Sequence, residues 1–307
     1  MLVQDPPVEI IDNLWMLGTN LYPLYLLKGR QGGTIVEGGT GAMGPILREQ
    51  LAQLGIAADF VRQVIVTHAH PDHVMAVPLF REMFPGVTVI ASATAAKTLQ
   101  AEKAVAFFCK ADDMLTGALI QSGVVGEQHR RPPLASNQIP VDRVVKEGER
   151  IDVDEAVALE VLETPGHSDC SLSFYDAARR VLIISDATGY YVPQHDTWWP
   201  NYFSDYGAYV RSIERLAALD AEVLCLSHNA VIRGADDVRD YFRRALEVTR
   251  AYHERIVADT KAGKSAEEIA AALGAEVYQK TQLMPADFFV KNCGLLVKMS
   301  LKHAGIA

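Results

Sequence analysis

Cysteine is scarce in this chain, with only four residues among 307: Cys109, Cys170, Cys225 and Cys293. No two of them are spaced as Cys-x-x-Cys, which predicts reduced thiols in a cytoplasmic protein and not a disulfide framework. The first seven residues contain neither a basic residue nor an apolar run. We therefore expect no secretory signal peptide.

Basic residues are also fewer than acidic ones, 29 against 38, which gives a net charge of -9. Because phosphate backbones select for clustered Lys and Arg, we expect no nucleic-acid partner, although a local basic pocket for a small anion stays possible. No apolar run is long enough to span a bilayer, so no membrane partner is expected. What the chain does have is 49% hydrophobic residues, enough for one large core with an appendage or for two modest domains.

Short apolar runs alternate with stretches of helical spacing through most of the chain. Such alternation, with several hairpin-like pairs, predicts a layered α/β fold. The expected helices are 42–54, 74–84 and 208–219. The expected strands are Val8–Leu17, Tyr22–Leu27, Thr34–Val36, Val61–Val66, Val87–Ile90, Ala158–Leu162, Ser171–Tyr175, Val181–Ile184 and Val223–Leu226.

Two segments depart from this alternation. Residues from about 95 to 140 are helical and then loop-like in pattern, and we expect them to form a lid-like insertion in which Phe107, Phe108, Met114 and Leu115 are available to pack. From Asp236 onward the pattern is almost entirely helical. These patterns predict a domain of residues 1–235, which contains the insertion, and a helical C-terminal segment of residues 236–307.

The sequence Thr67-His68-Ala69-His70-Pro71-Asp72-His73 places three imidazoles and a carboxylate within six residues. These groups are common ligands of divalent metals such as zinc, and they fill a hydrophobic core poorly. The alternative is a polar turn before a helix, with Asp72 as its N-cap.

Three later apolar runs also end at a candidate ligand. His167 follows the run at 159–162, Asp186 follows the run at 181–184, and His228 follows the run at 223–226. Because ligands of α/β proteins bind at the carboxyl ends of strands, these side chains are expected to converge on a two-metal site. The other histidines lack such a setting and are expected at the surface or in supporting positions: His129, His195, His253 and His303.

The series His-x-His-x-Asp-His, followed by His, Asp and His, resembles the metallo-β-lactamase-fold hydrolase superfamily from about Val8 to Ala230. The resemblance implies a four-layered αβ/βα sandwich of two similar halves that holds two divalent ions, with zinc favoured and iron or manganese as alternatives. It places one ion on His68, His70 and His167, the second on Asp72, His73 and His228, and Asp186 between them.

One motif departs from the family pattern. Many members carry Asp-x-Gly after an early strand, where this chain has Glu37-Gly38-Gly39. Metal-bound imidazoles usually donate their second N–H to a carboxylate or carbonyl, and Glu37 and Asp169 are candidates for that role. Cys170 lies near His167 in sequence and is expected to be a structural thiol.

The predicted chemistry is hydrolysis by a hydroxide shared between two metals and oriented by Asp72. The expected substrate is an ester, thioester or lactone of a small, partly apolar molecule. Glyoxalase-II-like and lactonase-like members share the same ligands, so the ligands do not separate them. Tyr190 and Tyr191 are candidates to hydrogen-bond a developing oxyanion, as in lactonases that resemble this architecture, or else they are pocket or core aromatics.

Other features leave alternatives open. An aromatic-rich loop is expected to line a substrate pocket or to form a homodimer contact; it contains Trp198, Trp199, Tyr202, Phe203 and Tyr206. A second group is basic and either holds a phosphate or carboxylate or is simply solvated; it contains Arg130, Arg131 and Lys146. Two further functions stay open: an iron-dependent sulfur dioxygenase with one metal, and a metal-bearing regulatory or binding protein with little turnover.

Overall fold

The computed structural model describes residues 1–154 and 157–306. Within them the strands form two seven-stranded sheets and a two-stranded hairpin. The first sheet has the order β2 (Val8–Ile11), β3 (Leu14–Gly18), β4 (Pro23–Lys28), β5 (Gly33–Val36), β6 (Val61–Ile65), β7 (Thr88–Ser92), β8 (Arg143–Val145). The second has the order β1 (Leu2–Val3), β16 (Val231–Arg233), β15 (Val223–Leu226), β12 (Val181–Ser185), β11 (Leu172–Asp176), β10 (Ala158–Glu163), β9 (Arg150–Asp152).

The two sheets pack face to face, and each has helices on its outer face. Because alternate residues of a strand point to opposite faces, a strand buried on both sides contributes to two cores. In β12, Val181 and Ile183 join the core between the sheets, whereas Leu182 and Ile184 join the core beneath the outer helices. The first sheet is built the same way, with Tyr25 in the central core and its neighbours in the outer one.

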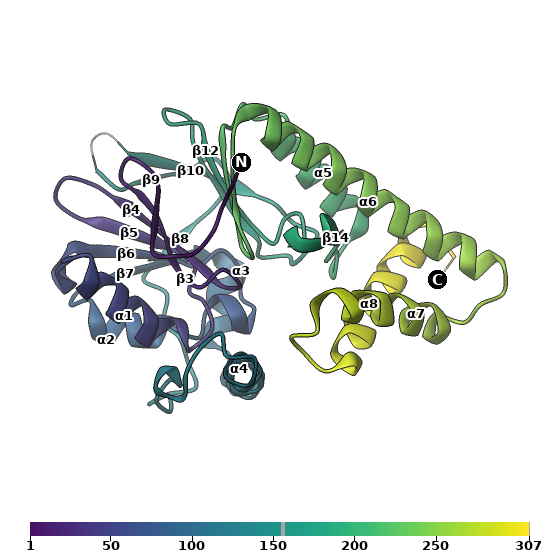
Figure 1. Cartoon of the computed structure of the whole chain (residues 1–307), viewed down its shortest axis with the longest axis horizontal. Helices are drawn as coiled ribbons and strands as arrows, with labels where there is room; N and C mark the ends of the chain where they lie inside the picture. Colours follow the sequence, from purple (N-terminus) through teal and green to yellow (C-terminus); the bar gives the residue numbers. More distant parts are fainter. Residues whose placement is uncertain (155–156, 307) are drawn as a thin grey trace.

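Helices close the sandwich on both sides (Figure 1). The first sheet is covered by α1 (Met43–Gln53), α2 (Val77–Met83), α3 (Ala93–Gln100) and α4 (Glu102–Gln121). The second sheet is covered by α5 (Tyr206–Ala217) and α6 (Ala235–Lys261), and α7 (Ala266–Thr281) and α8 (Ala286–His303) extend the same core. Three cores separate four layers, which confirms the predicted αβ/βα sandwich, the helical insertion and the helical C-terminal segment.

Several predicted elements differ in detail. The run at 8–17 is not one strand but the hairpin of β2 and β3, because Asn13 turns the chain with a φ of +62°. The helix expected from Val74 starts at Val77, after a separate 3₁₀ turn at Pro71–His73. Trp198 and Trp199 do not lie in a loop; they belong to β14 (Thr197–Trp199), which pairs with β13 (Tyr190–Val192).

The C-terminal helices share a hydrophobic core with the second sheet. Leu273 of α7 and Leu296 of α8 are fully buried in the same core as Leu182 and Leu224 of the second sheet. A division of the chain at residue 235 stays a prediction. Of the residues that the structure describes, no helix has the length and apolar character needed to cross a membrane.

Candidate metal centre

The seven predicted ligands all lie at one edge of the sandwich, where strands of both sheets end. His68 and His70 follow β6, and Asp186 and His228 directly or closely follow β12 and β15. These strands belong to parallel pairs, β5 with β6 and β12 with β15, so their carboxyl ends point the same way. Sequence-distant side chains are thereby brought together: His68, His70, Asp72, His73, His167, Asp186 and His228.

Three imidazoles form the first group. His70 Nδ1 lies 3.0 Å from His68 Nε2 and 2.9 Å from His167 Nε2. Together with Asp186, their donor atoms all lie within 4.8 Å of one another. Three imidazole nitrogens and one carboxylate oxygen at this spacing form a four-donor set of the kind that zinc binds tetrahedrally.

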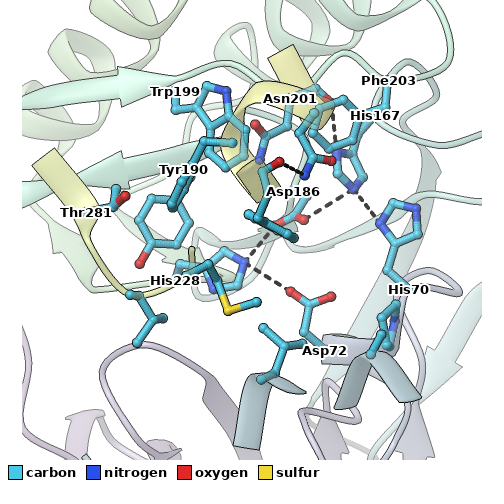
Figure 2. Close-up of a pocket in the computed structure, with 18 of the residues that line it drawn as sticks. His70, Asp72, His167, Asp186, Tyr190, Trp199, Asn201, Phe203, His228 and Thr281 are labelled. Carbon is cyan, nitrogen blue, oxygen red and sulfur yellow. Dashed lines mark hydrogen bonds and ion pairs between the residues drawn. The ribbon is translucent and has the colours of Figure 1, made fainter. Parts of the chain in front are cut away.

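The second group combines Asp72, His73 and His228. Asp72 Oδ2 lies 3.5 Å from His73 Nε2 and 3.8 Å from His228 Nε2. Asp186 faces this group as well as the first one. Its Oδ1 is 3.4 Å from His228 Nε2, and its Oδ2 is 3.2 Å from His167 Nε2. Figure 2 shows this carboxylate between the two histidines. Asp186 therefore lies where one side chain can contact two cations.

Electrostatics favour neutral imidazoles in the first group. Burial, and then the neighbouring imidazoles, lower the pKa of His68 well below its usual value and that of His70 to about 3. Burial also lowers the pKa of His167, despite the charge of Asp186. Because a metal binds the neutral imidazole, these three nitrogens have lone pairs available at neutral pH.

The second group attracts positive charge. Burial opposes a charge on His73, but Glu37, Asp72 and Asp186 outweigh it and raise the pKa of His73 well above its usual value. His73 Nε2 is buried with no hydrogen-bond partner among the described residues. This nitrogen lies among carboxylates and has no hydrogen-bond partner, which suits the binding of a cation. The cation would supply the positive charge that a proton on the ring otherwise supplies. The residues present therefore suit divalent ions.

The second ring nitrogens are held by the surrounding chain. His73 Nδ1 donates to Glu37 Oε2 at 2.8 Å, and His167 Nδ1 donates to the Asn201 carbonyl at 2.8 Å. His228 Nδ1 donates to the Leu21 carbonyl at 2.6 Å. Such bonds fix the tautomer of the neutral ring, so that Nε2 of each ring would offer its lone pair to a metal ion that takes the place of the proton.

Glu37, which replaces the aspartate of the family's Asp-x-Gly motif, hydrogen-bonds the second ring nitrogen of His73. It is 2% exposed, has a left-handed φ of +84°, and accepts a hydrogen bond from Thr67 Oγ1 as well as from His73. Backbone strain of this kind is concentrated at functional sites. The other candidate, Asp169, is exposed. Of the two, only Glu37 contacts a member of the cluster in the structure.

The turn that carries His167 depends on a glycine. Gly166 has a φ of +127°, and a Cβ at this position would lie 2.3 Å from the Tyr209 backbone. No other residue fits so close to α5, and the approach sets His167 against the Asn201 carbonyl. Cys170, three residues later, is buried and accepts a hydrogen bond from the Ala69 N–H at 3.3 Å, which is a structural role.

A cavity of about 320 Å³ opens above the cluster. Tyr190 lines it, and its ring lies 4.9 Å from that of His228. Tyr191, its neighbour in β13, points away, and its hydroxyl bonds to Asp196. Burial raises the pKa of Tyr190 to about 12, so its hydroxyl keeps its proton at neutral pH.

Sequence reasoning missed part of the cavity wall. Tyr22 lines it and packs edge-on against His228 at 5.3 Å. The α7–α8 segment contributes apolar side chains from Leu283 to Leu295. The aromatic residues between 198 and 206 fall into two groups. Trp199 and Phe203 line the cavity, whereas Trp198, Tyr202 and Tyr206 are buried in the core of the second sheet.

The other basic and histidine candidates lie elsewhere. Arg131 pairs with the buried Asp112 at 2.6 Å, and Arg130 pairs with Glu127 on the surface. His129 lies beside Glu49, and His253 stacks on Tyr206. None of these residues lines the cavity within the described part of the chain.

Comparison with known proteins agrees with this geometry. The family model of the metallo-beta-lactamase superfamily matches residues 22–228, two thirds of the chain. This chain belongs to the metallo-beta-lactamase superfamily. The seven clustered side chains lie within the matched range, and the cluster together with the family suggests a metal-dependent hydrolase that binds divalent ions.

Solved structures of the superfamily have the same fold. A metallo-beta-lactamase family protein from Thermus thermophilus is 25% identical, with a TM-score of 0.64 over 97% of this chain and 95% of its own. A Cronobacter sakazakii metallo-beta-lactamase with a HARLDQ motif is 21% identical, with a TM-score of 0.57 over 84% and 96%. A subclass B3 enzyme of Bradyrhizobium japonicum is 19% identical, with a TM-score of 0.58 over 85% and 97%. The Thermus match covers nearly the whole chain and so extends well past residue 228.

Proposed function

We propose that this protein is a dinuclear metallohydrolase that cleaves an ester, thioester or lactone carbonyl. The observation that carries the proposal is the position of Asp186, whose two oxygens face two complete ligand groups at the floor of an apolar cavity. Five of the seven donors are imidazoles, which favours zinc over magnesium, calcium or manganese.

When bound, two divalent ions would supply a nucleophile from water near neutral pH and polarise the substrate carbonyl. Asp72 orients the attacking water. Burial alone would raise its pKa, but His73 and His228 lower the pKa of Asp72 to about 2, so it is ionised and accepts a hydrogen bond. It also lines the cavity, which places the carboxylate beside the reacting atoms.

Tyr190 is the proposed donor to the developing oxyanion, because its ring lies at the cavity wall beside His228 and its hydroxyl keeps its proton. The hydroxyl donates a long bond of 3.4 Å to Asn229 Oδ1, which it would exchange for a bond to the oxyanion. Changing Tyr190 to Phe should lower kcat by about tenfold to a hundredfold with little change in KM, since the lost bond forms in the transition state. Tyr191→Phe is the matched control, because that hydroxyl bonds Asp196 outside the cavity. Equal kcat values for Tyr190→Phe and the wild type would contradict the assignment.

The proposed function is tested with metal-loaded protein on a panel of small esters, thioesters and lactones. Steady-state rates should depend on loading and disappear with a chelator for at least one of the three classes. A flat rate across the whole panel at full metal loading would instead indicate a binding or regulatory protein.

A further inference from the structure

Two helices present apolar stripes to the cavity. In α4 the lining residues Phe107, Ala111 and Met114 are spaced i, i+4, i+7, and in α8 Phe288, Asn292 and Leu295 have the same spacing. Residues at this spacing lie on one face of a helix. Asn292 is the polar member of the α8 stripe, and its side-chain amide donates one hydrogen bond to the Phe288 carbonyl within α8. Segments of the chain about 180 residues apart thus face one space above the cluster.

The stripes leave large apolar side chains open to solvent. Phe107 is 64% exposed, Met114 is 59% exposed and Leu295 is 38% exposed, and all three line this cavity. Apolar surface gathered at one place, next to a reactive site, indicates a ligand that covers it. Deeper in the same cavity Leu115, Met284 and Phe289 are almost fully buried, so the apolar wall continues inwards.

Apart from the metal ions proposed at its floor, the described part of the cavity offers no cationic side chain to an anionic substrate. Among the described residues that line it there is no Lys or Arg; its ionisable groups are the histidines, aspartates and tyrosines of the site. Arg131 donates a hydrogen bond to Asp112 and Arg130 donates one to Glu127, so both arginines are paired outside the cavity. A phosphate or carboxylate held between the two helices, away from the metal site, would lose hydration without gaining a charged side chain as partner.

We propose that the space between α4 and α8 is an acyl-binding slot, and that the substrates are esters, thioesters or lactones with an uncharged alkyl or aryl group. This rests on the proposed hydrolase function and narrows it. The group lies between the two apolar stripes while its carbonyl reaches the floor of the cavity, where Asp72 and Asp186 would help to hold the metal ions. Phe107, Met114 and Leu295 are the specificity-determining residues at the rim, and charged leaving groups such as coenzyme A add nothing to recognition.

The first test is the dependence of kcat/KM on acyl length, from acetyl to octanoyl esters of one leaving group. Each added methylene should raise kcat/KM up to about fourfold until the slot is filled. The F107A/M114A/L295A variant should flatten this dependence, so that its kcat/KM falls most for octanoyl esters and least for acetyl esters. Its thermal unfolding midpoint should match that of the wild type, because exposed truncations leave the fold intact. The control is V124A/V144A, two exposed residues outside the cavity.

The second test compares thioesters of the same acyl group on coenzyme A and on neutral N-acetylcysteamine. Similar kcat/KM values support the slot, and a gain of about tenfold or more with coenzyme A overturns it, because such a gain requires a cation. A length dependence that is flat in the wild type, or unchanged in the triple variant, also overturns it.

A binding measurement separates the slot from the chemistry. Isothermal titration calorimetry of the metal-loaded protein should detect octanamide but not acetamide, and the triple variant should weaken octanamide binding at least tenfold. If octanamide binds in this way and no panel substrate turns over, the hydrolase function fails while the slot stands. If neither amide binds, or the triple variant binds octanamide as tightly as the wild type, the slot is wrong whatever the enzyme hydrolyses.

Discussion

Replacing Asp186 with alanine is expected to lower kcat/KM about a thousandfold or more, the largest loss of any single substitution in this protein. Asp186 faces His167 through one oxygen and His228 through the other, so its removal takes a donor from both groups. Steady-state kinetics at saturating zinc, together with the metal content after desalting, measures the effect. The variant should retain fewer than two ions per chain.

Asp176→Asn is the matched control for this substitution. Asp176 is also a buried aspartate of the second sheet, but it pairs with Arg179 away from the cluster. The control should lower thermal stability and leave the metal content unchanged, because it breaks a buried ion pair without removing a donor. Full metal content and activity in Asp186→Ala would contradict the shared role of this carboxylate.

Glu37→Gln is expected to weaken the binding of the second ion by about tenfold to a hundredfold. This is the range found when a residue that hydrogen-bonds a metal ligand is replaced. Glutamine keeps the size and the left-handed backbone of Glu37 but removes the charge that raises the pKa of His73. Competition with a chromophoric chelator should resolve two binding steps. The step assigned to Asp72, His73 and His228 should shift, and the other should not.

Asp169→Asn is the control, because Asp169 lies in the loop after His167 and is exposed. Its two metal affinities should equal those of the wild type. Equal weakening of both steps in Glu37→Gln would mean that Glu37 acts on the whole fold and not on His73.

The clustering of the seven candidate ligands was predictable from the sequence because each of them closely follows a strand or lies in a short loop. The strand pattern and the His-x-His-x-Asp-His spacing are local, so they remain readable without tertiary information. Only the division of supporting roles between Glu37 and Asp169 stayed open. The supporting role of Glu37 depends on its left-handed backbone conformation, which lets its carboxylate reach His73. No sequence pattern predicted that conformation.

The cavity was harder to predict because its wall comes from distant segments. Tyr190 and Tyr191 were equivalent candidates as sequence neighbours, but they lie in the strand β13, whose alternation sends one side chain to the cavity and the other to Asp196. The i, i+4, i+7 stripe of Phe288, Asn292 and Leu295 was readable as a helix face. The position of α4 on the opposite side of the cavity could not be predicted, because no local sequence pattern relates these two distant helices.

The most direct test of the central claim is metal analysis of the protein purified without added metal, combined with hydrolysis and oxygen-consumption assays on the same sample. The structure predicts two divalent ions per chain at full loading, with hydrolysis that rises as the second ion binds. One iron per chain with oxygen consumption and no hydrolysis would contradict it and would indicate an oxidoreductase.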